Sequence, residues 1–162
     1  MTRRYILSCD GGGVRGIFTS GFLKELEQFL IQHDVIKESI TEIFNVFVGT
    51  STGAIIAAAL ATGLYSGRDI CDEVYTNENA RHIFSKKQCW IKRKAMWVPK
   101  YYAEPRYEVG RKIFGETHMY DLKHKLIVTT YNLRCRKPYF WSNVSIPNGP
   151  DGNNFPNPTV LD

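Results

Sequence analysis

The chain has 162 residues, of which 43% are hydrophobic and 23% are charged, and its formal net charge is +5. This length suits one domain with a hydrophobic core, and the composition is that of an ordinary soluble globular protein. No apolar run reaches the roughly 18 residues that a membrane-spanning helix needs. The apolar run behind Arg3 and Arg4 stops at Asp10, so we predict neither a signal peptide nor a transmembrane segment.

The first half of the chain alternates strand-like and helix-like patterns. Tyr5–Cys9 is a short β-prone run that ends in a glycine cluster. Apolar residues then recur at helical spacing from Val14 to His33. A second buried strand is predicted at Asn45–Val48, and an alanine-rich helix follows from Thr52 to Leu64.

The second half continues this alternation. Arg68–Tyr75 is predicted to begin a further helix, and Glu108–Phe114 has helical spacing again. Lys125–Tyr131 is a third clear strand and Pro138–Ser142 a fourth, whereas residues 146–158 are rich in Pro, Gly and Asn and read as a loop. We therefore predict an α/β fold, a three-layer sheet with helices on both faces.

The cysteines bear on the location of the protein. They are scattered along the chain and include no CxxC pair; they are Cys9, Cys71, Cys89 and Cys135. This usage is typical of free thiols in a reducing compartment. We predict a cytoplasmic protein, which a basic segment could bring to membranes as a peripheral protein.

That basic segment runs from Lys86 to Lys112. Nine Lys and Arg residues lie in it, opposed only by Glu104 and Glu108, and five Trp and Tyr residues are interleaved with them. Such a composition suits an anionic lipid surface or a nucleic acid. The alternative is a solvated, partly irregular insertion whose aromatic side chains pack on the core. We retain the anionic membrane surface as a partner to test and expect no nucleic acid.

The first of two glycine-framed motifs is Asp10-Gly11-Gly12-Gly13-Val14-Arg15-Gly16. A glycine triplet that enters a helix N-terminus presents backbone N–H groups and the positive end of the helix dipole. Such groups stabilise the negative oxygen of the tetrahedral intermediate in ester hydrolysis. Arg15 has two alternative roles: it orients the loop or meets a phosphate head group, or it forms a structural salt bridge, with Asp10 as the candidate partner.

The second motif is Gly49-Thr50-Ser51-Thr52-Gly53, which has the G-x-S-x-G form of a nucleophile elbow. In that elbow the serine occupies a tight turn between a strand and a helix, and glycines allow the two to approach closely. Val46–Val48 precedes the motif and Ala54–Ala58 follows it, so both flanks are present. An exposed serine beside a group of backbone N–H donors is the minimal equipment for acyl transfer.

A nucleotide site is the rival interpretation of the first motif. Gly11–Gly16 also matches the dinucleotide pattern G-x-G-x-x-G, for which an acidic residue should end a second strand about 20 residues later. Asp34 and Glu38 lie in that zone without closing a convincing strand. No Gly-Lys-Ser/Thr follows the glycines, which excludes a P-loop. A nucleotide-binding protein is the least favoured class.

Taken together, the two motifs resemble those of the patatin-like phospholipases. That family carries D-G-G-G-x-R-G followed by G-x-S-x-G, and both stand here intact. Tyr107–Tyr131 and Tyr139–Asn143 are also similar to stretches of the family. The resemblance implies hydrolysis of acyl-ester lipids by a Ser–Asp dyad, without histidine, metal or cofactor at the active site. By that resemblance Ser51 is the nucleophile. The residues of the oxyanion hole are Gly11, Gly12 and Gly13. The residues that support the motifs are Asp10, Arg15, Gly16, Gly49 and Gly53.

The dyad aspartate is where this sequence departs from the family. The family's aspartate lies in Asp-Gly-Gly or Asp-Gly-Ala, well after the strand matched by Tyr139–Ser142. This chain has only Asp151-Gly152-Asn153, close behind that strand. We expect residues 1–162 to be a patatin-like domain that is incomplete at its C-terminus, before the last strands, so that the dyad aspartate is missing from this chain. Asp151 is retained as a substitute base, against the alternative of an ordinary turn residue.

A histidine base is a further alternative. In the α/β-hydrolase order the histidine comes last, and His82, His118 and His124 all follow Ser51. None of them lies in a loop after a late strand, where that order needs it. The sequence favours a phospholipase A or esterase type of hydrolase acting on phospholipid or another acyl-ester lipid. The alternative is a catalytically inactive lipid-binding or interaction fragment of such an enzyme.

Overall fold

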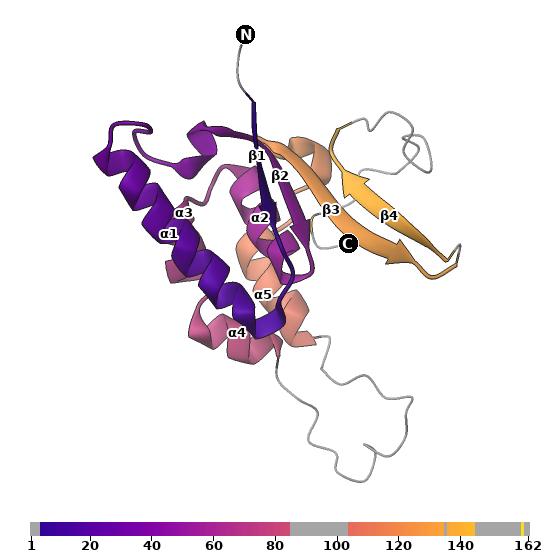
Figure 1. Ribbon diagram of the computed structural model, residues 1–162. Helices are drawn as coiled ribbons and strands as arrows, with labels where there is room; N and C mark the ends of the chain where they lie inside the picture. Colours follow the sequence, from indigo (N-terminus) through magenta and orange to yellow (C-terminus); the bar gives the residue numbers. More distant parts are fainter. Residues whose placement is uncertain (1–3, 85–103, 135, 145–159, 161–162) are drawn as a thin grey trace.

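The structure is a computed structural model that describes residues 4–84, 104–134, 136–144 and 160 (Figure 1). Its centre is a four-stranded sheet in the order β1 (Tyr5–Cys9), β2 (Phe44–Thr50), β3 (Lys125–Asn132) and β4 (Lys137–Ser142). β1, β2 and β3 are parallel, and β4 is antiparallel to β3. All four predicted strands are present, and this mixed sheet with its helices confirms the α/β class.

The helices follow the strands in the predicted alternation. A 3-10 turn, η1 (Gly13–Arg15), and α1 (Gly16–Gln32) follow β1, and a second such turn, η2 (Ile40–Glu42), precedes β2. After β2 come α2 (Thr52–Thr62), α3 (Gly67–Asp69), the π-helical segment η3 (Ile70–Val74) and α4 (Asn77–Ile83). α5 (Glu104–Phe114) and the 3-10 turn η5 (Met119–Asp121) lead into β3.

One face of the sheet packs against the helices. Leu7, Phe47 and Leu126 are paired neighbours on three adjacent strands, so their side chains share that face. Phe47 and Leu126 are fully buried, as are Ile56 and Leu60 of α2, and all four belong to one hydrophobic core. In Figure 1, α2 and α5 lie behind the sheet on this side. The core therefore sits between β1–β3 and the helical layer.

The opposite face is apolar and open. Ile6, Val46, Val48 and Ile127 alternate with the residues of the covered face and so point the other way. Ile6 is 63% exposed, and the other three are half-buried. A second helical layer on this face, which the sequence predicts, is not among the residues that the structure describes.

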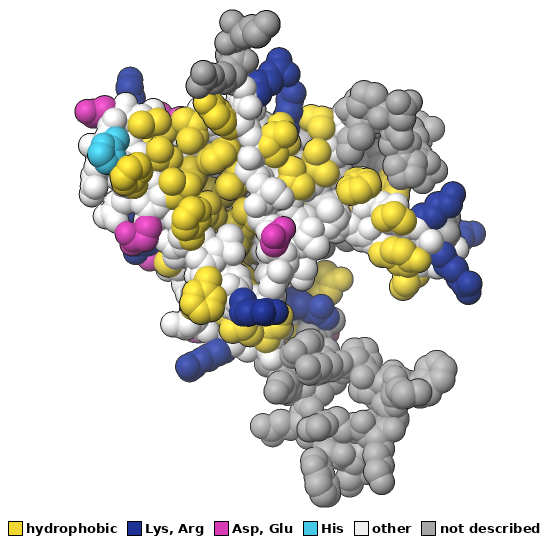
Figure 2. All heavy atoms as spheres, viewed as in Figure 1, with side chains coloured by type: hydrophobic (Ala, Val, Ile, Leu, Met, Phe, Trp, Pro, Cys, Tyr) yellow, Lys and Arg dark blue, Asp and Glu magenta, His cyan; other side chains and the backbone are white. Residues whose placement is uncertain are grey.

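α1 turns its most apolar stripe outward. The exposed aromatic residues of this helix are Phe18, Phe22 and Phe29, with exposed fractions of 76%, 63% and 55%. The buried positions are Gly16, Ser20, Leu23 and Glu27. Figure 2 shows hydrophobic side chains gathered over α1 and β1. The hydrophobic periodicity therefore predicts the helix correctly, but its inward side mixes small and polar residues with the buried Leu23, while three of its aromatic residues face outward.

A buried carboxylate connects α1 to two other parts of the chain. Glu27 is 3% exposed. Its Oε2 accepts hydrogen bonds from the backbone N–H groups of Ile40 (2.8 Å) and Gly67 (2.7 Å), and its Oε1 accepts one from that of Arg68 (3.0 Å). Gly67 and Arg68 begin α3, where a negative charge complements the helix dipole. Glu27 therefore fixes the start of the segment that continues through η3.

α2 is short and almost entirely buried. It ends at Gly63, whose φ of 72° provides the left-handed conformation that commonly terminates a helix. Its 11 residues are too few to cross a bilayer. In the described part of the chain, none of the helices has the length and hydropathy of a membrane span.

Candidate active site

Ser51 lies at the turn between β2 and α2. Its backbone φ is 54°, a left-handed conformation that is uncommon for residues other than glycine, and the residue is exposed. A Cβ on Gly49 would lie 2.4 Å from the carbonyl oxygen of Gly53, and a Cβ on Gly53 would lie 2.0 Å from that of Cys9. Because these distances are far inside van der Waals contact, the turn needs both glycines. This is the geometry of a nucleophile elbow.

The glycine loop passes directly beside this turn. β1 pairs with β2 in a register that sets Cys9 opposite Gly49, so the residues after each strand meet at one edge of the sheet. A Cβ on Gly11 would lie 3.0 Å from Ser51 Cβ. Gly13 has a φ of 58°, in the region that favours glycine. The two predicted motifs are therefore adjacent in space.

The backbone N–H groups of the loop are not equivalent. The N–H of Gly12 donates to Thr52 Oγ1 at 3.2 Å, and the Gly12 carbonyl accepts from the N–H of Arg15 at 3.1 Å. The N–H groups of Gly11 and Gly13 have no acceptor among the described residues. Two of the three predicted oxyanion donors are therefore available in this structure, and the third is engaged by Thr52.

The other residues of the first motif have separate positions. Gly16 is buried at the start of α1, and a Cβ there would lie 2.8 Å from Cζ of Tyr75, so close packing explains this glycine. Asp10 and Arg15 are exposed, and no ion pair forms between these two described residues. The predicted alternative of a salt bridge between them is therefore wrong. Arg15 instead closes the loop through its backbone bond to Gly12.

A cavity of about 570 Å³ opens beside Ser51. It lies between α2, the covered side of β3 and β4, and α5. Its apolar lining includes Ala54, Ile55, Ala58, Phe114, Val128 and Trp141. Arg106 is the one charged residue in the described lining. A largely apolar cavity that begins at a serine is suited to a hydrocarbon chain attached to the group that the serine contacts.

The described residues hold no base for Ser51. No hydrogen-bond partner of its Oγ is found among them, and no histidine lines the described wall of its cavity. His124 precedes β3, at the end of the sheet opposite Ser51, and burial, with the charge of Lys123, lowers its pKa. Asp151, the predicted substitute base, lies outside the described residues. The geometry therefore gives no support to a histidine base.

Cys9 is the other nucleophilic side chain near the turn. It is 2% exposed, and burial, together with the nearby charge of Asp10, raises the pKa of its thiol to about 11. A thiol that stays protonated at neutral pH is a weak nucleophile. Cys9 and Cys71 are both free thiols, as predicted. Cys9 is therefore buried and protonated where Ser51 is exposed at this edge of the sheet.

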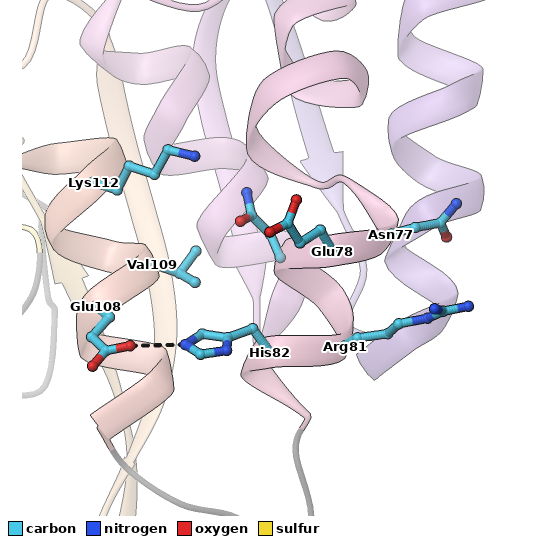
Figure 3. Close-up of a pocket in the computed structure, with 8 residues that line it drawn as sticks. Asn77, Glu78, Arg81, His82, Glu108, Val109 and Lys112 are labelled. Carbon is cyan, nitrogen blue, oxygen red and sulfur yellow. Dashed lines mark hydrogen bonds and ion pairs between the residues drawn. The ribbon is translucent and has the colours of Figure 1, made fainter.

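A second groove, of about 720 Å³, lies between α4 and α5 (Figure 3). His82 and Glu108 point toward one another across it, with 2.8 Å between Nε2 and Oε2, whereas Arg81 points to the other side of α4. Its described lining shares no residue with that of the Ser51 cavity. Both partners of the ion pair are exposed, and the described part of the chain has no group of three or more His, Cys, Asp or Glu that could hold a metal. The ion pair therefore joins α4 and α5, and the groove contributes no described residue to the Ser51 cavity.

Two residues that hold the glycine loop were not predicted from the sequence. Thr52 occupies an unrestricted position of the second motif, yet it accepts the N–H of Gly12. The hydroxyl of Tyr75 donates to the carbonyl oxygen of Gly13 across 62 positions of sequence. No local pattern could have pointed to Tyr75, because it reaches Gly13 only through the packing of η3 against α1 and α2.

An α/β sheet with a glycine-flanked serine turn and an adjacent glycine loop is the architecture of a hydrolase. The sequence model of the patatin-like phospholipase family matches residues 7–159, and the chain belongs to this family of lipid hydrolases. It is 35% identical over 151 residues to the cGAMP-activated phospholipase of Escherichia coli. It is 30% identical over 143 residues to patatin-like protein 1 of Oryza sativa subsp. indica and 31% identical over 147 residues to patatin-like protein 4 of Arabidopsis thaliana.

These alignments cover most of this chain but a minor part of each relative. They include 90%, 85% and 85% of this chain, and 40%, 34% and 36% of the respective relatives. The chain therefore spans two fifths or less of the length of these curated relatives. The resemblance predicted from the two motifs is confirmed at the level of the family.

Proposed function

We propose that Ser51 is the nucleophile of an acyl hydrolase that acts on a phospholipid or another acyl-ester lipid. The observation that carries this proposal is the position of Ser51, on an exposed left-handed turn between the glycine loop and an apolar cavity. A lipid ester has a hydrocarbon chain on one side of its carbonyl group. With that chain in the cavity, the carbonyl carbon remains at Ser51 and its oxygen faces the loop.

In the proposed reaction, Ser51 Oγ attacks the ester carbonyl carbon while its proton passes to a base. The carbonyl oxygen becomes negative and accepts hydrogen bonds from the free N–H groups of Gly11 and Gly13. Each donor of this kind typically contributes about 10²–10³ in rate. The alcohol leaves with a proton, and water then hydrolyses the acyl-serine ester and releases the fatty acid. The N-terminus of α2, at Ser51, adds a positive dipole end.

The base of the proposed reaction is an aspartate. This part of the proposal is supported by the resemblance to the family, in which a Ser–Asp dyad is expected. Asp151 is a substitute candidate within residues 1–162, with an ordinary turn residue as the alternative. Removing a partner from such a catalytic unit costs orders of magnitude in rate, so the reactivity of Ser51 depends on it.

Two cationic features would suit an anionic phospholipid. Arg106 lines the cavity of Ser51, where its guanidinium could bind the phosphate of a head group that remains outside the apolar part. Binding of an anionic membrane through residues 86–112 remains a proposal, since residues 85–103 lie outside the described part of the chain.

The alternative function is a catalytically inactive lipid-binding fragment. One observation favours it: among the described residues, Ser51 Oγ has no hydrogen-bond partner that could act as a base. Such a fragment would bind lipid through the same cavity and would not turn it over.

A fluorophosphonate probe distinguishes the two functions. We expect the wild-type chain to be labelled and Ser51→Ala to be unlabelled, because the probe forms an adduct only with an activated serine. Ser8→Ala, at another exposed serine, is the matched control and should label like the wild type. Absence of labelling in the wild type would exclude the hydrolase for this chain. Binding of the unlabelled chain to phosphatidylglycerol vesicles would then support the lipid-binding alternative.

A further inference from the structure

Tyr75 is a buried phenol directly beneath the glycine loop. It is 1% exposed, and its hydroxyl donates a hydrogen bond to the carbonyl oxygen of Gly13. Its ring packs against Gly16 so closely that a Cβ on that residue would lie 2.8 Å from Cζ and 2.9 Å from the hydroxyl oxygen. The last glycine of the first motif therefore makes room for this phenol, and the phenol holds the loop from below.

Thr52 holds the same loop through a second hydrogen bond. Its Oγ1 accepts a hydrogen bond from the backbone N–H of Gly12 at 3.2 Å. The only proton of the Tyr75 hydroxyl is used on the Gly13 carbonyl. Two side-chain hydroxyls from different elements therefore hold adjacent parts of the loop: Thr52 holds the Gly12 N–H, and Tyr75 holds the Gly13 carbonyl.

These two hydrogen bonds orient the peptide groups of the loop. With the Gly12 N–H and the Gly13 carbonyl both turned toward the hydroxyls, the left-handed Gly13 is held at its φ of 58° and its own N–H is left free. We propose that Tyr75 and Thr52 are positioning residues that set the direction of the oxyanion-binding N–H groups. The inference rests on the proposed function of the loop and of Ser51.

The placement of Tyr75 supports a role beyond filling space. It follows the π-helical segment η3, and its N–H bonds to the carbonyl of Ile70 at 2.7 Å. π-Helical turns are rare and occur frequently at functional sites. The ring alone could be supplied by phenylalanine, whereas the hydroxyl is needed only for the hydrogen bond to the Gly13 carbonyl. Burial raises the pKa of the Tyr75 phenol, so the hydroxyl keeps its proton and remains a donor at neutral pH.

The first test removes only this hydroxyl. Tyr75→Phe should lower the rate of fluorophosphonate labelling of Ser51, and kcat for a short p-nitrophenyl ester, by about 10- to 100-fold with little change in KM, since small misplacements of catalytic groups cost up to about 10²-fold. Tyr65→Phe is the matched control, because the Tyr65 hydroxyl donates to the carbonyl of Ile113 at 3.0 Å, outside the loop. Equal rates in the two folded variants would overturn the proposal.

The second test changes Thr52. Thr52→Val removes the hydroxyl and should slow labelling, whereas Thr52→Ser retains it and should restore labelling toward the wild-type rate. If the two hydroxyls hold one conformation of the loop, the loss in the double variant with Tyr75→Phe should be well below the product of the single losses, and multiplicative losses would contradict the proposal. If Tyr75→Phe fails to fold, the absence of rescue by Thr52→Ser would still overturn it.

A third readout needs no activity. Hydrogen exchange at the Gly12 amide should accelerate at least tenfold in Thr52→Val and Tyr75→Phe and remain unchanged in Tyr65→Phe. Thr52→Val removes the acceptor of this N–H, and Tyr75→Phe releases the adjacent Gly13 carbonyl that holds the same part of the loop. Unchanged exchange in both would refute the positioning role. If the wild type is not labelled but exchange responds as expected, the proposed function fails while the positioning of the loop stands.

Discussion

The buried carboxylate of Glu27 allows a quantitative prediction of stability. It accepts three backbone hydrogen bonds, from Ile40, Gly67 and Arg68, at 2.7–3.0 Å. Hydrogen bonds to charged groups contribute about 1.5–3 kcal/mol each. Glu27→Gln keeps one acceptor oxygen and turns an NH₂ group toward N–H donors, so at least one bond is lost, at a cost of about 2 kcal/mol. Glu27→Ala leaves all three donors without their acceptor and should cost about 5 kcal/mol.

The measurement is urea denaturation followed by circular dichroism. Natural domains have a free energy of unfolding of only about 5–15 kcal/mol, so Glu27→Ala should lose a third or more of it. Glu27→Gln should unfold at a clearly lower urea concentration than the wild type. Glu25→Gln, on the exposed side of the same helix, is the control and should stay within about 0.5 kcal/mol of the wild type. A Glu27→Gln variant as stable as Glu25→Gln would refute the anchoring role of this carboxylate.

Three further predictions concern pH, substrate and association. Because burial lowers the pKa of His124 in the folded state, the unfolded chain binds more protons below about pH 6.5. Stability, measured by urea midpoints, should fall as the pH drops from 7.5 to 5. His124→Gln should show a weaker fall, and a variant with the same pH dependence as the wild type would contradict the assignment of this effect to His124. Arg106→Gln should reduce kcat/KM for an anionic phospholipid about tenfold more than for a neutral p-nitrophenyl ester, the effect of one charge-assisted contact; Lys112→Gln, in the other groove, should be neutral, and equal loss on both substrates would count against a phosphate contact. Phe18→Gln combined with Phe22→Gln should shift the chain toward monomer in size-exclusion chromatography with light scattering, because both side chains are exposed; a wild-type chain that is already a monodisperse monomer would contradict that prediction.

The local elements were predictable because each is encoded in a short stretch of sequence. Tyr5–Cys9 and Asn45–Val48 are β-prone runs that end in glycines, and the observed strands follow them closely. The turn at Ser51 was predictable for the same reason, since strand, serine and helix are contiguous. The contacts around Gly49 and Gly53 give the physical basis of that motif.

Features that depend on distant contacts could not be read from the sequence. The outward direction of the Phe18 and Phe22 stripe is set by Glu27, which must reach Ile40 and α3 and so decides the buried side of α1. A salt bridge between Arg15 and Asp10 was a reasonable expectation because the two residues are near in sequence. The loop is instead held by Tyr75, which follows η3. A contact between residues so far apart in the sequence depends on the packing of the folded chain.

The left-handed backbone at Ser51 has an evolutionary consequence. A residue with a Cβ in such a conformation costs of order 1–3 kcal/mol, which glycine would largely avoid. If selection for chemistry were relaxed, folding stability alone would favour replacement of this serine by glycine. At this position, the residue that would give the most stable fold is glycine, which has no side chain that can react. If Ser51 is the nucleophile, as proposed, loss of the reaction in a descendant would be expected to begin at position 51, with the fold becoming more stable as the activity disappears.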